Sequence, residues 1–363
     1  MSVGVVEMDR LSLTPKTEGG TATNRRCVKC PEAGILSGLD PKKAVYCRPC
    51  FMQMVMHKFR SSIGRQRLFK DGESRKTVVI FDGTPAAAFL LGMIRSGLAA
   101  DAHHRLQLDP VVVAVVTKLD RQEIDAVIKR IDTIKSYLQC DWHIVHLAAV
   151  LSDNLQDLSS SSSEICPGVD QLDRLIELFS SIRSESGRSE MKVRLRTALL
   201  YRMTETMGVS KMMTSDTADR LAKLSLSSLA LGRGAQMSED TAVVDKRHPK
   251  VAVIRPLKEL SDKEVGIFNR FEQLDELTVI VGDPDRASPA VQTITDSFVT
   301  HLQAGFHSTL TTVLSSASKV KTATTSRIRC AFCFSSSDDR FCLACRGILD
   351  EVGEPSLLPS SLQ

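Results

Sequence analysis

Residues 77–88 read TVVIFDGTPAAA, and the class of fold can be predicted from them outward. The run Thr77–Phe81 is short, apolar and rich in β-branched residues, which is typical of a strand buried on both faces. A turn at Asp82–Pro85 follows, and the alanines after it begin an apolar helix that we expect to run from Ala86 to about Leu98. A buried strand, a tight turn and a helix form the first unit of an open α/β sheet.

The same alternation of buried strands and helices continues along the chain. Further strands are expected at Val111–Val116, His143–Leu147, Ser210–Thr214 and Val251–Arg255. Helices are expected at Arg121–Leu138, Gln171–Ile182, Ser189–Met207, Thr217–Leu231, Asp262–Phe271 and Ala290–Leu314. This order predicts an α/β fold, with a parallel sheet covered by helices on both faces. Ligands of such sheets bind beyond the carboxyl ends of the strands, which directs attention to the turn at residues 82–85.

Eight of the ten cysteines fall into C-x-x-C pairs, two pairs near each end of the chain. Four thiolates at this spacing satisfy a tetrahedral zinc ion. The expected ligands are Cys27, Cys30, Cys47 and Cys50 in the first set and Cys330, Cys333, Cys342 and Cys345 in the second. The spacing predicts two structural zinc sites. It leaves open whether each end closes its own site or the two ends share one, and a redox role for a pair is the lesser alternative.

Length and composition set broad limits. The chain has 363 residues, 42% of them hydrophobic, and a net charge of +4, which is too mild to indicate a nucleic-acid partner by itself. No apolar run is long enough to cross a bilayer, and the first twenty residues lack the apolar centre of a signal peptide. We therefore expect a cytoplasmic protein with no membrane and no DNA partner. In a reducing compartment the cysteine pairs favour metal over disulfides.

The composition shifts along the chain predict five regions. They are a disordered N-terminus, an N-terminal zinc module with a basic segment, an α/β core interrupted by a serine-rich loop, a C-terminal zinc module and a loose tail. Their bounds are 1–24, 25–70, 71–315 with the loop at 152–170, 316–350 and 351–363.

The turn after the first strand has the position of a phosphate-binding loop but a poor composition for one. It has a single glycine, Gly83, and Pro85 lacks the N–H that a phosphate would accept from. Asp82 places a negative charge at its mouth, and the absence of lysine excludes a Walker A loop. From these residues alone, an ordinary turn between a strand and a helix is favoured over a working phosphate site.

Four stretches carry a resemblance to a known family. The F-D-G-T-P-A of residues 81–86 resembles an eroded S-G-G-x-D-S loop of PP-loop ATP pyrophosphatases. T-S-D-T-A-D-R-L-A at 214–222, with L-G-R-G at 231–234, resembles the second nucleotide-site segment of tRNA-thiolating PP-loop proteins. R-P-L at 255–257 with Glu264 resembles a third segment. The N-terminal C-V-K-C…Y-C-R-P-C-F and H-K-F-R resemble the cytoplasmic tRNA 2-thiolation protein 2 family.

This resemblance implies a Rossmann-like PP-loop core and a place in the complex that forms 2-thiouridine at wobble position U34 of tRNA Lys, Glu and Gln. It implies a heterodimer with a catalytic PP-loop subunit, which takes sulfur from a thiocarboxylated ubiquitin-related modifier. This chain would be the non-catalytic subunit and contribute tRNA binding. Its remnant of a nucleotide site would comprise Asp82, Gly83, Thr84, Asp216 and Arg255. The eroded loop argues against binding of ATP and Mg²⁺ by this chain.

A basic segment follows the first cysteine set and reads KFRSSIGRQRLFK. Cations neutralise phosphates and aromatic rings stack on bases, so this segment is a candidate RNA-binding site. The alternative is a solvated helix face or a packing arm. Its candidate residues are Lys58, Arg60, Arg65, Arg67 and Lys70. A second basic stretch, at residues 192–202, mixes helix faces and is expected to be a solvated surface.

Two rival functions remain open at this stage. The chain could be an active ATP-dependent tRNA sulfurtransferase, with Asp82 or Asp216 holding Mg²⁺ and the two unpaired cysteines, Cys140 and Cys166, as weak catalytic candidates. Ordinary unreactive thiols are the favoured interpretation of both cysteines. The chain could also be a zinc-ribbon scaffold that binds only protein.

Overall fold

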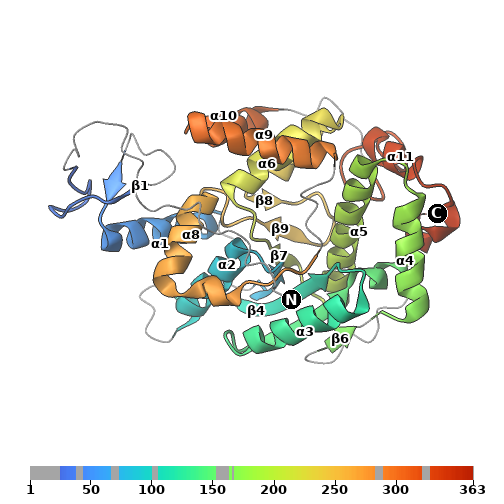
Figure 1. Cartoon of the computed structure of the whole chain (residues 1–363), viewed down its shortest axis with the longest axis horizontal. Helices are drawn as coiled ribbons and strands as arrows, with labels where there is room; N and C mark the ends of the chain where they lie inside the picture. Colours follow the sequence, from blue (N-terminus) through green and yellow to red (C-terminus); the bar gives the residue numbers. More distant parts are fainter. Residues whose placement is uncertain are drawn as a thin grey trace, which may run out of the picture.

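At the centre of the molecule lies a seven-stranded sheet with strand order β6-β5-β4-β3-β7-β9-β8 (Figure 1). All neighbouring strands run parallel except β8, which is antiparallel to β9. The strands are β3 Lys76–Phe81, β4 Asp109–Val116, β5 Asp141–His146, β6 Ser163–Ile165, β7 Lys211–Met213, β8 Val244–Asp245 and β9 Ala252–Ile254. The structure, a computed structural model, describes residues 25–37, 44–66, 73–99, 105–152, 163–165, 167–282, 289–320 and 328–362. The expected α/β class is confirmed.

Helices cover both faces of the sheet because successive side chains of each strand point to opposite faces. On β3, Val79 and Phe81 join one hydrophobic cluster, whereas Val78 and Ile80 join the other. The first face is covered by α2 Pro85–Leu98, α3 Arg121–Lys135 and α8 Asp262–Glu272. The second face is covered by α4 Val169–Ser181 and α5 Glu185–Thr206.

Local sequence explains why the chain turns directly after β3. Gly83 has a φ of 71°, a conformation that costs glycine little, and ends the strand. Thr84 caps α2, its Oγ1 accepting a hydrogen bond from the N–H of Ala87 at 3.3 Å, and Pro85 suits the first helical position. Phe89 of α2 packs edge-on against Phe268 of α8, with ring centroids 4.8 Å apart, which holds the helix on the sheet.

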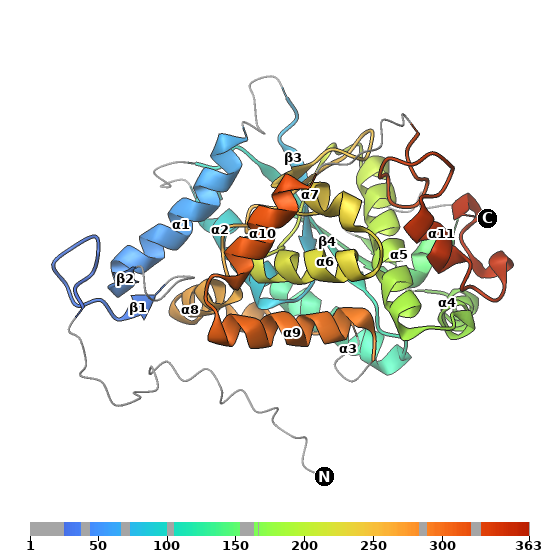
Figure 2. The same cartoon turned by 90° about the horizontal axis from the view of Figure 1, so that it is seen from above.

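A further layer is formed by α6 Ala218–Ala230, α9 Val291–Gly305 and α10 Thr309–Lys319, which lie together in Figure 2. The single helix expected over residues 290–314 is wrong, because the chain breaks after Gly305 and forms two helices. Phe306 adopts an extended conformation at the break, and Leu310 and Leu314 of the second helix pack against α6. The second helix also continues past residue 315, where the core was expected to end, to Lys319.

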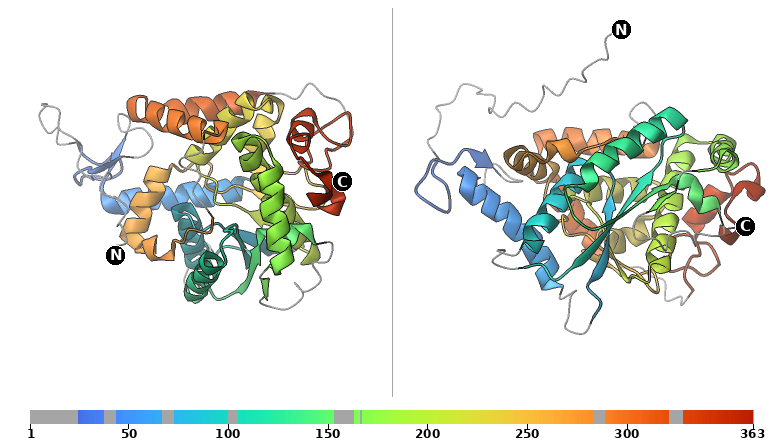
Figure 3. Two further views of the ribbon diagram at one scale, coloured as in Figure 1. Left: turned by 45° about the vertical axis from the view of Figure 1, so that its right-hand side comes forward. Right: turned by 90° about the horizontal axis from the view of Figure 1, so that it is seen from below.

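The two cysteine-bearing ends lie on opposite sides of the molecule (Figures 1 and 2). The N-terminal end is a hairpin of β1 Leu36–Ser37 and β2 Val45–Tyr46, followed by α1 Arg48–Arg65. The C-terminal end contains α11 Leu343–Leu349 and lies beside α4 in Figure 3.

The C-terminal tail differs from the expectation of a loose segment. It forms short 3-10 helices at Pro355–Leu357 and Ser360–Leu362, and buries Leu357, Leu358 and Leu362 in the same cluster as α4 and α5. Burial of these apolar side chains against the helices orders the tail. The composition of the tail alone did not indicate this contact. The disordered N-terminus expected at residues 1–24 and most of the serine-rich loop lie outside the described residues. Among the described helices, none is long and apolar enough to span a membrane.

Candidate functional site

The turn after β3 is occupied by an ion pair between two residues of the chain itself. Arg220, at the start of α6, places Nη1 2.5 Å from Oδ2 of Asp82. The other oxygen, Oδ1, accepts hydrogen bonds from Oγ1 of Thr84 at 2.7 Å and from Oγ of Ser215 at 3.3 Å. The Asp82 side chain is only 10% exposed. An internal guanidinium therefore lies at the position where a phosphate-binding loop would hold its ligand.

The electrostatics of this pair are strong. Burial alone would raise the pKa of the Asp82 carboxyl, but the positive charges of Arg220 and Arg196 outweigh burial and hold its pKa at about 2. Although burial opposes the effect, Asp82 and Asp216 in turn raise the pKa of Arg220 above its ordinary value. Both groups are charged across the physiological pH range.

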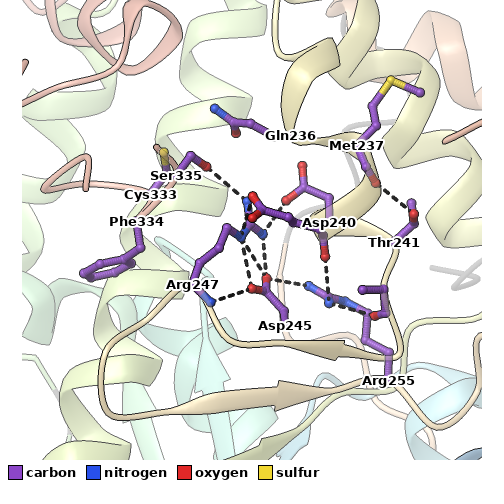
Figure 4. A network of polar contacts seen from close by, with 12 residues as sticks. Gln236, Met237, Asp240, Thr241, Asp245, Arg247, Arg255, Cys333, Phe334 and Ser335 are labelled. Atoms are coloured by element: carbon purple, nitrogen blue, oxygen red, sulfur yellow. Dashed lines mark hydrogen bonds and ion pairs between the residues drawn. The ribbon is translucent and has the colours of Figure 1, made fainter. Parts of the chain in front are cut away.

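The ion pairs continue away from the turn as a network. Oδ1 of Asp216 lies 3.3 Å from Nε of Arg220, and Oδ2 of Asp216 lies 3.5 Å from Nε of Arg255. Arg255 also approaches Asp245, whose carboxylate is shared with Arg247 at 2.5 Å (Figure 4). The network thus joins the turn to the far edge of the sheet, where β8 and β9 lie.

Figure 4 shows where this network ends. Nη1 of Arg247 donates a hydrogen bond to Oγ of Ser335 at 3.1 Å, and Ser335 lies in the C-terminal cysteine module. Arg247 also forms an ion pair with Asp240, in which Nη2 of Arg247 lies 2.5 Å from Oδ1 of Asp240. The turn after β3 and the C-terminal module are therefore linked by one continuous chain of charged side chains.

A backbone segment also covers the turn. The N–H of Val279 donates to the carbonyl of Gly83 at 2.9 Å, and the N–H of Thr117, just after β4, donates to the carbonyl of Val281 at 2.8 Å. A Cβ atom on Gly83 would lie 1.9 Å from the carbonyl oxygen of Val279. Residues 279–281 therefore cross the carboxyl ends of the two central strands, where ligands of open α/β sheets normally enter.

The structure brings all five expected remnant residues to this region. Asp82, Gly83 and Thr84 form the turn, Asp216 is joined to it by Arg220, and Arg255 is joined to Asp216. Arg220 was not among the expected site residues, although it stands in the quoted segment 214–222, four residues after Asp216. That i, i+4 spacing at a helix start was the available signal.

One expected part of the site lies elsewhere. The L-G-R-G segment at 231–234 follows the C-terminal end of α6, whereas Asp216 and Arg220 lie at its N-terminal end. A helix of this length separates its ends by about 20 Å. Residues 231–234 therefore do not belong to the turn.

Each end of the chain gathers its own four cysteines, so the alternative of one shared site is excluded. In each set the four Sγ atoms lie within 4.8 Å of one another. Sγ of Cys30 is 3.5 Å from that of Cys47, and Sγ of Cys333 is 3.7 Å from that of Cys342. A tetrahedral zinc ion with Zn–S bonds of about 2.3 Å requires sulfur separations of about 3.8 Å, so the donor sets fit a metal ion of this kind.

The two cysteine sets differ in their surroundings. All four C-terminal cysteines are buried in the hydrophobic cluster that covers one face of the sheet. Nε2 of Gln236 lies 3.8 Å from Sγ of Cys342 as a hydrogen-bond donor. In the N-terminal set, Cys30 and Cys50 are half-exposed. The C-terminal set is thus part of the core, and the N-terminal set lies on a peripheral hairpin.

Comparison with known proteins places the chain in a family. A family model described as cytoplasmic tRNA 2-thiolation protein 2 matches residues 290–356. The Caenorhabditis elegans protein of that description is 35% identical, over 91% of this chain and 95% of its own length. The chain belongs to the cytoplasmic tRNA 2-thiolation protein 2 family. The human member is 29% identical, over 82% of this chain and 67% of its own length.

The fold has a solved counterpart. A structure described as U34-tRNA thiolase NcsA from Methanococcus maripaludis with its [4Fe-4S] cluster superposes with a TM-score of 0.62 and 15% identity. It covers 88% of this chain and 95% of that chain, which supports the expected PP-loop core. Membership of the cytoplasmic tRNA 2-thiolation protein 2 family establishes a role in tRNA thiolation. The expected cytoplasmic location agrees with the descriptions of the family members.

The unpaired cysteine that the structure describes, Cys140, is poorly placed for sulfur chemistry. Cys140 immediately precedes β5 and therefore lies at the amino edge of the parallel sheet, opposite to the turn after β3. Burial raises the pKa of the Cys140 thiol to about 11, which keeps it protonated and unreactive. Cys166 lies outside the described residues.

The basic segment is partly committed to packing. Nζ of Lys58 lies 2.7 Å from Oε1 of Glu264, whose side chain is fully buried, and Arg65 lies 3.1 Å from Glu259. Phe59, on the same helix, is buried in the core. Arg60 is partly exposed. The candidates Arg67 and Lys70 lie outside the described residues.

The second basic stretch is not the solvated surface that was expected. The Arg194 side chain is only 14% exposed and lies 3.7 Å from Glu190. Arg202 donates hydrogen bonds to the carbonyls of Val150 and Ser152 at 3.0 and 2.6 Å. Arg202 thereby ties α5 to the segment that follows β5, whereas Arg194 pairs within its own helix, because long side chains on several helix faces can each reach a separate partner.

Proposed function

We propose that this chain is the non-catalytic subunit of a cytosolic complex that forms 2-thiouridine at the wobble position of tRNA Lys, Glu and Gln. Its partner in this proposal is a catalytic PP-loop subunit, and the sulfur comes from a thiocarboxylated ubiquitin-related modifier. The chain contributes tRNA binding and a scaffold with two structural zinc sites.

The observation that carries this proposal is the ion pair between Arg220 and Asp82. Adenylation of a base requires room for nucleotide phosphates and Mg²⁺ beside the loop. Here Arg220 occupies the turn, the N–H of Thr84 donates to Asp82 at 3.3 Å, and that of Ala87 donates to Thr84. Residues 279–281 cross the same edge. These backbone N–H groups already donate to acceptors within the chain and are not available to a phosphate. This supports catalysis by a partner subunit.

The tRNA surface proposed for this subunit is the exposed side of α1 together with the hairpin before it. Arg60 is partly exposed, and the segment just before the hairpin adds the exposed cations Arg25, Arg26 and Lys29. The NcsA protein, whose fold is related, is described as a thiolase of tRNA position U34. Positive charge next to a peripheral cysteine cluster favours an RNA backbone contact.

The decisive experiment uses this chain alone, the catalytic subunit alone, and the complex of the two, each assayed for ATP binding, tRNA binding and tRNA thiolation. We expect ATP binding only where the catalytic subunit is present, and tighter tRNA binding by the complex than by either chain. Thiolation by this chain alone with ATP and a sulfur donor would refute the proposal.

The two rival functions have separate tests. Replacing Cys140 and Cys166 by serine distinguishes an active sulfurtransferase, because undiminished thiolation in cells eliminates sulfur chemistry at these thiols. The scaffold alternative predicts that charge reversal of Arg60 leaves the tRNA affinity of the complex unchanged. The raised pKa of the half-buried Cys140 thiol supports the non-catalytic assignment over the first rival.

A further inference from the structure

A cavity of about 310 Å³ lies between the start of α5, the turn after α6 and α11. Its lining includes three charged residues, Glu190, Arg233 and Glu351, and the apolar residues Leu343 and Ile348. Gly347 also lines it, and a Cβ atom on that glycine would meet nothing within 4 Å. The cavity is therefore open at this position and mixed in polarity.

Among the described residues, one nitrogen of the Arg233 guanidinium lacks a hydrogen-bond partner in this cavity. The residue is 2% exposed, and Nη2 lies 3.0 Å from Oε2 of Glu190. Nη1 is buried and has no hydrogen-bond partner in the described part of the chain. A buried guanidinium nitrogen without an acceptor costs about 1–3 kcal/mol, so native structures rarely leave one.

The neighbouring carboxylates do not accept a hydrogen bond from Nη1 in the described structure. Glu190 already contacts Arg233 and Arg194, and its Oε1 accepts from Nε2 of Gln292 at 3.2 Å. Oε2 of Glu351 accepts from the N–H and the hydroxyl of Ser184 at 3.1 and 2.6 Å. Among the residues that the structure describes, Oε2 of Glu190 makes no hydrogen bond of its own, and Nη1 of Arg233 is therefore available to an acceptor from a ligand.

The charges and the rim restrict the chemistry of that ligand. One free guanidinium nitrogen suits a single negative charge on oxygen, and the carboxylates of Glu190 and Glu351 repel a dianion such as phosphate more strongly than a monoanion. Leu343, which is 85% exposed, and Ile348 offer an apolar rim. These features fit a carboxylate attached to a small apolar or amide-containing group.

We propose that the cavity between α5, α6 and α11 is a binding site for a monovalent carboxylate, which pairs with Nη1 of Arg233. The site is separate from the turn after β3, because α6 places the two about 20 Å apart. It does not depend on the function proposed above. The carboxylate belongs either to a small free acid or to the carboxyl terminus of a polypeptide.

The test measures binding to the full chain loaded with zinc, by calorimetry and ligand-observed NMR. The probes are N-acetylglycine, its uncharged amide, the peptide N-acetyl-Ala-Ala-Ala with a free carboxyl end, and inorganic phosphate. We expect the two carboxylates to bind at least about tenfold tighter than the amide. Tighter binding of the peptide than of N-acetylglycine would identify a polypeptide end as the source, and the reverse order a small acid.

Two variants keep the proposal falsifiable. Arg233→Met should weaken carboxylate binding at least about tenfold. If that variant misfolds, Gly347→Val narrows the cavity without removing a charge and should abolish binding. Gly266→Val, on α8, is the matched control, since a Cβ there also meets nothing within 4 Å. Equal binding of the acid and its amide, preference for phosphate, or unchanged binding in Gly347→Val would overturn the proposal.

Discussion

Arg220 and Asp82 are 138 residues apart in the sequence, yet the Nη1 atom of one lies 2.5 Å from the Oδ2 atom of the other. Asp82 directly follows β3, and Arg220 lies in the first turn of α6, the helix that follows the neighbouring strand β7. Parallel neighbouring strands bring the segments after them to the same edge of the sheet. The internal cation thereby neutralises the charge that Asp82 places in the eroded loop.

Replacement of Asp82 by asparagine should change how stability depends on pH. The pKa of Asp82 falls from 3.8 to about 2 in the folded chain, so the carboxylate stabilises the fold above pH 4. That contribution is lost as the pH falls through 2. Since Arg220 is 45% exposed, solvent screening reduces the expected contribution to about 1–2 kcal/mol.

Urea unfolding between pH 2 and 7, followed by fluorescence of the buried Trp142, measures this effect. Asp82→Asn should be less stable than the natural chain at pH 7, and the difference should vanish toward pH 2. The exposed Asp125→Asn serves as control. Parallel pH curves for the natural chain and the Asp82 variant would contradict the assignment.

Gly83→Ala should destabilise the chain strongly. The substitution adds a Cβ at a φ of 71° and 1.9 Å from the carbonyl oxygen of Val279. We expect a loss of about 3 kcal/mol or more, because backbone strain and displacement of residues 279–281 add together. Gly266→Ala on α8 should instead gain up to about 1 kcal/mol. A melting temperature unchanged by Gly83→Ala would mean that residues 279–281 do not cover the turn.

Loss of the two cysteine clusters should have unequal effects. Cys345→Ser removes a ligand from the buried set and should lower the free energy of unfolding by more than about 3 kcal/mol. Cys30→Ser should release one metal ion and leave unfolding of the core, followed through Trp142, close to that of the natural chain. Metal analysis should find two zinc ions per natural chain. Iron with visible absorbance would instead reopen the catalytic alternative.

Lys58 and Arg60 should separate stability from tRNA binding on one helix. Lys58→Met leaves the carboxylate of Glu264 buried without its cation and should cost about 2 kcal/mol of stability. Arg60→Glu should leave stability nearly unchanged and reduce both the tRNA affinity of the complex and its salt dependence. Denaturation and filter binding at several salt concentrations check both. Equal tRNA affinity of Arg60→Glu and the natural complex would remove α1 from the proposed RNA surface.

The class of fold and the metal ligands could be predicted from the residues alone. Buried strands such as Val111–Val116 are recognisable because an unbroken apolar run rich in valine is stable only when both faces of the strand are covered. The cysteine spacing predicted two tetrathiolate sites for a similar reason, since a C-x-x-C pair is a local geometric unit. The eroded composition of residues 82–85 also predicted that a phosphate would bind poorly there.

What replaces the phosphate depends on contacts between distant parts of the chain, which become visible in three dimensions. Neither the cation at Arg220 nor the backbone of residues 279–281 can be assigned to the turn from local periodicity, which describes neighbours within a few residues. The same limit explains why Arg194 was expected to be solvated, why α9 and α10 were expected as one helix, and why the tail was expected to be loose. In each case the contact that decides the structure is with residues distant in sequence. A residue pattern indicates how polar a position is, but it does not identify the group that the position contacts in the folded chain.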